Sequence, residues 1–330
     1  MIEVKLSSVS VNGSKELISQ QTPCGKGVWG EYKFFADDEI TQCDYWVVFD
    51  TLSCNEVGFC PPNNTIFVAG EPKNVKTYNK HFLKQFATVI TSQDSVAHNN
   101  VINTHHVLPW FVKKSYDELI GMTDQNKSNL LSIVTSNKRF SAEHEQRYQF
   151  ALAIKKYFGN AVDLYGRGIR NFDDKWDVLA PYKYSIAIEN FSSKYYATEK
   201  LTDCFLSYTF PFYYGCTNLE DYYPKGSYQY IDITDVEGSI SIIQKVLQDS
   251  SHYEQHFDAL CAARFKYLNE YQIFPNLAKI IARMDEKNDV NSCKKAIHLS
   301  PSDMTFSDLH FKGRCLAGII RNTIDSRLKR

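Results

Sequence analysis

The chain has 330 residues, of which 43% are hydrophobic, and its formal net charge is −1 at pH 7. This near-neutral balance argues against a nucleic-acid partner, because such partners require a basic face. No apolar run approaches the roughly 20 residues that cross a bilayer, and the length allows two domains, each with its own core.

The N-terminal third predicts strands separated by polar segments. The expected strands are 1–9, 44–49, 65–70 and 87–91, and the expected helix is 75–86. Residues 107–110, which follow two histidines, are expected to form a strand that closes the first domain. Residues 113–129 are rich in Asp, Gln, Asn, Ser and Lys, so we place a boundary there and assign 1–125 to the first domain.

The rest of the chain alternates strand and helix patterns, which predicts an α/β domain with a parallel sheet. The expected elements are strands 130–135, 161–165, 184–188, 209–214 and 228–233, and helices 141–158, 199–208, 236–248, 253–271 and 277–285. We assign 126–305 to this second domain. The tail 306–330 is expected to form a helix that packs back on the first domain.

The segment 181–215 is the most informative stretch of the sequence. Its strand ends at Glu189 and Asn190, and the next helix starts near Glu199 and Lys200. The loop between them therefore lies at the carboxyl end of a parallel strand, where open α/β sheets bind ligands. A lysine beside the free N–H groups of a helix start favours phosphate. Glu199 is better suited to a ribose diol, and the alternative is an ordinary exposed Glu-Lys pair.

This segment resembles the donor-binding signature of glycosyltransferase family 10, the α-1,3/4-fucosyltransferases. The resemblance is carried by Ile186–Asn190, Tyr196–Lys200 and Pro211–Gly215, within a weaker similarity from about Cys43 to Ile233. It implies the GT-B fold, in which two Rossmann-like domains face each other across a cleft. The first domain would bind the acceptor and the second the GDP-sugar.

The resemblance also implies a reaction: inverting transfer of L-fucose from GDP-fucose to N-acetylglucosamine of a β-galactoside-containing glycan, at O3 or O4. Animal members usually carry a membrane anchor, so the chain is expected to be a bacterial or viral form, or a trimmed one. Nine cysteines without a C-x-x-C pair favour a reducing compartment. We expect a cytoplasmic protein, with peripheral membrane association and oligomeric state left open.

No Asp-x-Asp motif for a metal occurs in the sequence. We therefore expect no cofactor and no metal, and expect cationic side chains to stabilise the leaving diphosphate. Lys200 is one such cation, and Arg147 is the other, since Ser136, Asn137 and Arg147 match a Ser-Asn pair and a trailing arginine in the family. Two alternatives stay open. Arg139 could take this role in place of Arg147, or Arg147 could be an ordinary solvent-exposed helix residue.

Glu71 is the candidate general base. It follows the strand 65–70, and its Gly-Glu context is similar to that of the family's proposed base. A positioned carboxylate contributes roughly 10²–10⁴ in rate. Local sequence alone favours an ordinary loop carboxylate at Glu71, and the resemblance reverses this preference.

The remaining candidates surround the donor. The full set of predicted donor-binding residues is Ser136, Asn137, Gly166, Arg167, Glu189, Asn190, Tyr196, Thr198, Glu199 and Lys200. Glu189 has an alternative role as an internal anchor of its loop. A metal pair at His252 and His256 is set aside because no third ligand is evident.

Two other functions remain compatible with the sequence. The same fold could use another GDP-deoxyhexose or nucleotide sugar, because no residue reads the fucose methyl group directly. Alternatively, the chain could be an inactive glycan-binding protein. The joint presence of Glu71, Arg147 and Lys200 argues against the second alternative.

Overall fold

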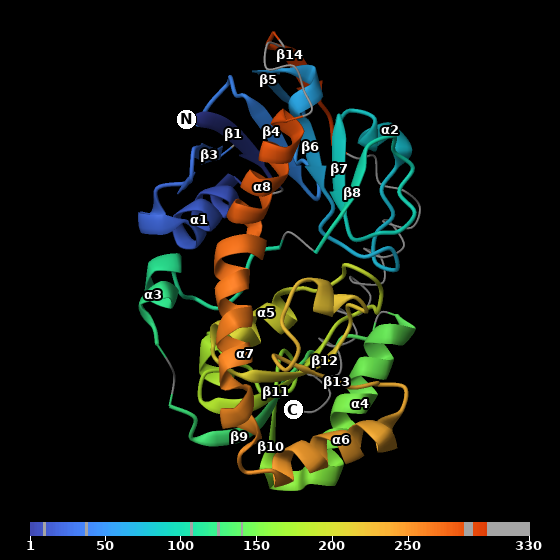
Figure 1. The fold of residues 1–330 in the computed structure, drawn as a ribbon. Coiled ribbons are helices and arrows are strands. Elements are labelled where there is room, and N and C mark those ends of the chain that lie inside the picture. Colours follow the sequence, from blue (N-terminus) through green and yellow to red (C-terminus); the bar gives the residue numbers. More distant parts are fainter. Residues whose placement is uncertain are drawn as a thin grey trace, which may run out of the picture.

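The computed structural model describes residues 1–8, 11–36, 39–105, 108–123, 126–139, 141–286 and 293–301. The chain forms two lobes, each built on a largely parallel sheet flanked by helices (Figure 1). The predicted α/β class is therefore confirmed. The lobes are stacked end to end, and the long α7–α8 segment runs along both of them (Figure 1).

The first lobe contains a seven-stranded sheet in the order β2-β3-β1-β4-β6-β7-β8, in which only β2 runs antiparallel to its neighbour. Its strands are β1 (Ile2–Ser7), β2 (Val28–Trp29), β3 (Tyr32–Ala36), β4 (Tyr45–Phe49), β6 (Thr65–Val68), β7 (Thr88–Thr91) and β8 (Val101–Asn103). β4 and β6 are continuous apolar runs buried on both faces, which is typical of central parallel strands. Their carboxyl ends point toward the second lobe.

Helices cover both faces of this sheet, and one comes from the far end of the chain. They are α1 (Val11–Gln21), α2 (Lys80–Leu83) and α8 (Ile273–Asp285). The apolar side of α8 packs against the β1, β3 and β4 face. A small antiparallel pair adds β14 (Lys295–Leu299) to β5 (Glu56–Cys60).

The extent predicted for the second domain, 126–305, is therefore wrong at its C-terminal end. Residues 273–285 and 295–299 belong to the first lobe, because the apolar stripe of α8 is buried on the first sheet and β14 pairs with β5. The spacing of apolar residues in the sequence showed that this helix is amphipathic, but it did not show which sheet the apolar side packs against. The predicted tail helix 306–330 lies outside the described residues.

The second lobe contains a five-stranded parallel sheet in the order β10-β9-β11-β12-β13. Its strands are β9 (Asn129–Val134), β10 (Val162–Tyr165), β11 (Tyr182–Ile188), β12 (Phe210–Tyr214) and β13 (Gln229–Tyr230), and its helices are α3 (Tyr116–Gly121), α4 (Ala142–Phe158), α5 (Glu199–Leu206), α6 (Val236–Gln248) and α7 (His252–Lys266). Trp110, Val112 and Leu119 are part of this lobe's core. The chain thus joins the second lobe before the boundary proposed at residue 125.

Short helical turns lie between several of these elements. The 3-10 turns are Pro23–Gly25, Pro62–Asn64, Gly159–Ala161, Lys175–Val178 and Leu219–Asp221, and a π-helical turn, Tyr267–Tyr271, links α7 to α8. The buried amide of Gln272 donates to the carbonyl of Gln21 (3.3 Å), which fixes this link against α1.

Two local predictions fail for physical reasons. The helix predicted over 75–86 is reduced to α2, because Tyr78 is drawn to the sheet edge, where its hydroxyl contacts the Asp50 carboxylate and the N–H of Glu71. The strand predicted over 107–110 is also wrong for its described part, since 108–110 are not extended into a sheet and β8 closes the sheet earlier. Strands β2, β3, β5, β8 and β14 and helices α1 and α3 were not predicted.

Candidate active site

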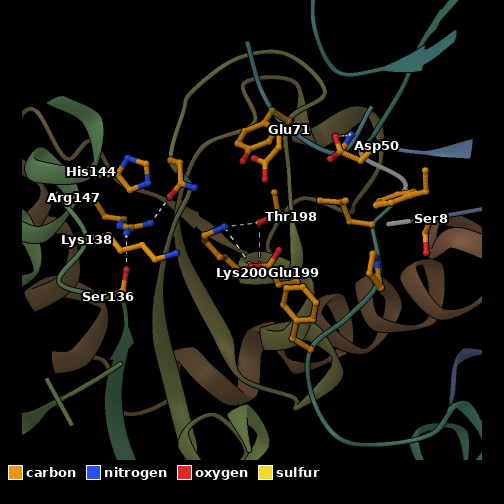
Figure 2. Close-up of a pocket in the computed structure, with 17 residues that line it drawn as sticks. Ser8, Asp50, Glu71, Ser136, Lys138, His144, Arg147, Thr198, Glu199 and Lys200 are labelled. Atoms are coloured by element: carbon orange, nitrogen blue, oxygen red, sulfur yellow. Dashed lines mark hydrogen bonds and ion pairs between the residues drawn. The ribbon is translucent and has the colours of Figure 1, made fainter. Parts of the chain in front are cut away.

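A cavity of about 600 Å³ lies between the two lobes. It is formed where β4 and β6 of one sheet and β9 and β11 of the other reach their carboxyl ends, the usual ligand position in such sheets. Its lining residues are Ser8, Phe49, Asp50, Gly70, Glu71, Leu108, Pro109, Phe111, Ser136, Lys138, His144, Arg147, Asn190, Tyr196, Thr198, Glu199 and Lys200 (Figure 2).

Glu189 organises the loop that precedes α5. It is 1% exposed, and its carboxylate accepts hydrogen bonds from the Thr198 N–H and hydroxyl, both at 2.7 Å. Lys200 Nζ adds a third contact at 3.2 Å. Glu189 does not line the cavity, so the structure favours its role as an internal anchor of this loop.

Lys200 presents a fixed positive charge to the cavity. Its Nζ lies 2.9 Å from Thr198 Oγ1 and 3.4 Å from Glu199 Oε1. Burial by itself favours the neutral amine, but the carboxylates of Glu189 and Glu199 outweigh it and raise the pKa of Lys200 to about 12. With 21% of the side chain exposed, Lys200 is not part of an ordinary solvent-exposed Glu-Lys pair.

Glu199 remains an anion beside this lysine. Burial acts to raise its pKa, but Lys200, Lys175 and the Thr198 hydroxyl together lower the pKa of Glu199 to about 2. Lys175 also contacts this turn, since its Nζ donates to the Glu199 carbonyl (3.1 Å) and to the buried Asp203 carboxylate (2.7 Å). The first turn of α5 is therefore a rigid network of alternating charges.

Arg147 supplies the second cation from α4. It is 5% exposed, and its guanidinium donates to Asn190 Oδ1 and to Ser136 Oγ (3.3 Å) (Figure 2). Its buried Nε has no hydrogen-bond partner within the described part of the chain. The alternative, Arg139, is 53% exposed and pairs with Glu145 at 3.4 Å, so Arg147 is the arginine at the cavity.

Glu71 faces the α5 turn from the opposite lobe (Figure 2). Its backbone is held from two sides, since its N–H donates to the Tyr78 hydroxyl (3.1 Å) and its carbonyl accepts from Gln93 (2.8 Å). Burial, with a smaller contribution from Asp50, raises the pKa of Glu71 to about 7 despite the opposing charge of Lys200. A carboxyl group with a pKa near neutrality suits general base catalysis.

Three predicted donor residues lie beside the cavity rather than in it. Asn137 donates its N–H to the Arg167 carbonyl (3.2 Å), and the backbone of Gly166 packs directly on the Thr135 carbonyl. These contacts join the loops after β9 and β10 into one unit next to Ser136. The side chain of Arg167 is exposed to solvent.

Sequence reasoning missed several cavity residues. Asp50 directly follows the predicted strand 44–49, a position that already marks a ligand edge, and it has a left-handed φ of 64°. Lys138 and His144 flank Arg147 in the cavity wall. Burial and the charges of Arg147 and Lys138 lower the pKa of His144 to about 4, so this imidazole is neutral at pH 7.

Residues 124–298 match the family model "Glycosyltransferase family 10 (fucosyltransferase) C-term". This match covers more than half of the chain. It includes β11 and the helices α4 and α5, which carry Arg147 and Lys200, the two residues that form the cationic wall of the cavity. The chain belongs to glycosyltransferase family 10. The resemblance noted in the sequence is thereby confirmed.

Individual relatives agree with this membership. The chain is 29% identical over 91 residues to Alpha-(1,3)-fucosyltransferase FucT of Helicobacter pylori, a segment that covers 27% of this chain and 18% of that protein. A crystal structure of an alpha1,3-fucosyltransferase with GDP superimposes with a TM-score of 0.55 and 18% identity, over 87% of this chain and 91% of that one. A crystal structure of an alpha1,3-fucosyltransferase with GDP-fucose superimposes with a TM-score of 0.52 and 17% identity, over 89% of this chain and 93% of that one. At these identities the likeness shows the fold, which is GT-B as predicted.

Across the described residues, no group of three or more His, Cys, Asp and Glu side chains could hold a metal ion. His252 and His256 stack on each other with ring centroids 4.0 Å apart, packed against Phe210 in the second lobe and away from the cavity. Within the same residues, no helix is long and apolar enough to span a bilayer.

Proposed function

We propose that the protein transfers L-fucose from GDP-fucose to O3 or O4 of N-acetylglucosamine in a β-galactoside-containing glycan, with inversion at the anomeric carbon. The observation that carries this proposal is the opposition of charges across the cavity. Glu71, a carboxyl group with a pKa of about 7, faces the buried cations Arg147 and Lys200 from the other lobe. Membership of the fucosyltransferase family supports the proposed donor and reaction.

Arg147 and Lys200 would hold the departing diphosphate. Both side chains are fixed by hydrogen bonds before any ligand arrives, so they lose little freedom when charge develops on the leaving group. Ser136, Asn190 and Tyr196 would complete the phosphate and sugar contacts. Thr198 would keep Lys200 in place, and Glu199 would accept hydrogen bonds from the ribose hydroxyls.

The nucleoside would extend toward the joined loops after β9 and β10. Asn137, Gly166 and Arg167 lie in these loops, next to Ser136 of the cavity wall, and the exposed side chain of Arg167 would turn toward the ligand. Glu189 would act through the loop that it anchors. The first lobe would then bind the acceptor and the second lobe the donor.

Glu71 would take the proton of the acceptor hydroxyl as that oxygen attacks the anomeric carbon. Attack from the Glu71 side and departure toward Arg147 and Lys200 give a single in-line displacement, which inverts the β-linked donor to an α-linked product. No covalent intermediate with the protein is needed. We also propose that these cations make a divalent metal unnecessary for the chemistry.

The test is a transfer assay with the purified protein. Radiolabelled GDP-fucose and N-acetyllactosamine should give a fucosylated product whose linkage NMR assigns as α, and the rate should be unchanged by excess EDTA. Parallel reactions with GDP-mannose and UDP-galactose should give no product. Transfer only from another nucleotide sugar would show that GDP-fucose is not the donor. Loss of activity with EDTA would refute metal independence. Glycan binding without transfer from any donor would show that the protein is a glycan-binding protein and not a transferase.

A further inference from the structure

Cys43 and Cys60 are neighbours on two adjacent backbone segments of the first lobe. Cys43 lies just before β4, and Cys60 is the last residue of β5. A parallel bridge joins the two segments, because the Phe59 N–H donates to the Thr41 carbonyl (2.8 Å) and the Cys43 N–H donates to the Phe59 carbonyl (2.9 Å). The bridge pairs Gln42 with Phe59. The residues that follow these two, Cys43 and Cys60, are therefore also adjacent.

The two cysteine side chains point to the same side of this bridge, into the core of the lobe. Cys43 is 1% exposed and Cys60 is 0% exposed, whereas the ring of Phe59 is open to solvent. The Cys43 Sγ lies 3.8 Å from the Phe59 carbonyl oxygen, and the Cys60 Sγ lies 3.8 Å from the Asp44 carbonyl oxygen. Each thiol thus reaches the backbone next to the other cysteine.

The two sulfur atoms are in contact but not bonded. Cys43 and Cys60 are free thiols that share a side-chain hydrogen bond. Neighbouring strands lie about 4.8 Å apart, and a disulfide spans Cα separations of about 4.4–6.8 Å. The backbone therefore already has the spacing that a disulfide needs. No other two cysteines share a hydrogen bond within the described part of the chain.

The surroundings make one thiol the nucleophile and the other its partner. The hydrogen bond from Cys60 lowers the pKa of Cys43 despite its burial, and the charges of Lys5 and Lys294 act in the same direction. Lys5 is held there, because it is buried and its Nζ lies 3.3 Å from Glu56 Oε2. The same hydrogen bond and burial raise the pKa of Cys60. Since the thiolate is the form that attacks a disulfide, Cys43 reacts first.

We propose that Cys43 and Cys60 form a disulfide when the chain folds in the presence of a low-molecular-weight disulfide such as oxidised glutathione. The Cys43 thiolate attacks one sulfur of the reagent, and the first glutathione leaves. The Cys60 thiolate then attacks the Cys43 sulfur of this mixed disulfide, and the second glutathione leaves. The protein loses two electrons and two protons, which convert the oxidised reagent into two molecules of reduced glutathione.

The position of this bond predicts an effect on stability and not on ligand binding. Both thiols are covered in the folded protein, so the exchange takes place before the first lobe closes over them, and the product is then protected. Neither cysteine lines the catalytic cavity. Figure 1 shows β5 at the end of the first lobe that is far from the second lobe. This inference does not depend on the proposed function.

Refolding in glutathione buffers tests the site. The reduced chain is unfolded in guanidinium chloride, refolded at a series of ratios of reduced to oxidised glutathione, and quenched with N-ethylmaleimide. Peptide mass mapping should find one linked pair of peptides, which contains Cys43 and Cys60. This link should form at ratios too reducing to oxidise Cys24 and Cys293, which are exposed and single.

Single substitutions show whether the pairing is specific. Cys43→Ala and Cys60→Ala should each abolish the link and leave the remaining cysteine alkylated. Cys261→Ala is the matched control, because Cys261 is a half-buried cysteine of α7 in the second lobe, and this variant should keep the link. The wild-type mapping decides even if a variant fails to fold. Complete alkylation of Cys43 and Cys60 at ratios that already oxidise Cys24, or pairing of either with other cysteines at equal frequency, would overturn the proposal.

The oxidised and reduced proteins should also differ in thermal stability. A cross-link restricts the unfolded chain, so the oxidised wild type should melt on the order of 5 °C above the reduced form. The difference should vanish in Cys60→Ala, and the dissociation constant of GDP should be the same for both forms of the wild type. Equal melting temperatures, or weaker GDP binding by the oxidised form, would contradict a stabilising bond that is independent of the catalytic cavity.

Discussion

The neighbours of two carboxyl groups in the cavity shift their pKa values in opposite directions. Glu199 is surrounded by lysines that lower its pKa to about 2, whereas burial and Asp50 raise the pKa of Glu71 to about 7. Groups separated in this way commonly divide the work of a site, one as a fixed charge and one as a proton carrier. The surroundings, and not the residue type, therefore make Glu199 suited to be the fixed charge and Glu71 suited to be the proton carrier.

Glu71→Gln should reduce kcat by at least about 100-fold, because the amide cannot accept the proton of the acceptor hydroxyl. The wild-type rate should fall as the pH decreases below about 7, since the carboxyl group is then protonated and no longer a base. Initial rates over pH 5–9 at saturating donor measure this. Glu220→Gln, at an exposed residue of the second lobe, should leave both kcat and the pH profile unchanged.

A wild-type profile that is flat from pH 5 to 8, or a Glu71→Gln enzyme with normal turnover, would remove Glu71 from the role of base. Asp50→Asn offers a finer measurement. The Asp50 charge contributes to the raised pKa of Glu71, so its removal should move the acidic limb of the profile to lower pH.

Arg147→Ala and Lys200→Ala should each lower turnover with GDP-fucose by at least about 100-fold, because each removes a preorganised contact to the leaving diphosphate. The dissociation constant of GDP should rise in parallel. Arg139→Ala is the control, since Arg139 is half exposed and outside the cavity. Melting temperatures are needed alongside, because Lys200 also contacts the buried Glu189; near-normal turnover in both folded variants would contradict the electrostatic mechanism.

At the scale of elements, the site depends on how two strand ends approach each other. Gly166, at the end of β10, has a φ of 140°, and a Cβ there would lie 1.4 Å from the Thr135 carbonyl oxygen at the end of β9. Only glycine allows this contact. It places Ser136 beside Arg147, so a backbone requirement in one loop positions a side chain in another.

Gly166→Ala should therefore destabilise the second lobe by more than about 2 kcal/mol, through backbone strain and a collision with Thr135. Chemical denaturation measures the free energy of unfolding. Gly121→Ala is the matched control, because a Cβ at Gly121 meets no atom within 4 Å, and its stability should be close to that of the wild type. Equal stability of the two variants would show that the loops can separate at little cost.

Helices whose ends are marked by their own capping residues were predicted well. α4 begins at its Ser141 cap and ends at Gly159, close to the predicted 141–158. α6 matches the predicted 236–248, starting at its Asp235 cap. α2 is shorter than predicted because Tyr78 is held at Asp50, a residue of another strand end. Contacts between elements, rather than propensity, decided that helix.

At the scale of the whole molecule, the chain passes between the lobes more than once. The segment 108–112 leads into the second lobe, and α7 and α8 return to the first along the side of both (Figure 1). One direct contact also crosses the cavity rim, since Asn74 donates to the Asn190 carbonyl at 3.4 Å. The distance between Glu71 and the cationic wall is therefore set by this lobe arrangement.

Nucleotide binding should stabilise the whole protein selectively. GDP at 100 times its dissociation constant should add about 2.7 kcal/mol to the free energy of unfolding, because it binds only the folded chain. Thermal shift assays with GDP and UDP, each with and without EDTA, measure this. A larger shift with GDP that EDTA does not change is expected, whereas equal shifts for the two nucleotides would count against a guanine-specific site.

The sequence by itself determined the class of fold and the family, and it singled out several residues that line the cavity, among them Glu71, Arg147 and Lys200. These features are local, because the three segments that carry the pattern, Ile186–Asn190, Tyr196–Lys200 and Pro211–Gly215, lie within the single stretch 181–215. The tertiary structure alone decided that Asp50 and His144 join Glu71 and Arg147, and that α8 covers the first sheet. Their positions depend on packing between elements far apart in the chain, which periodicity and residue type do not encode.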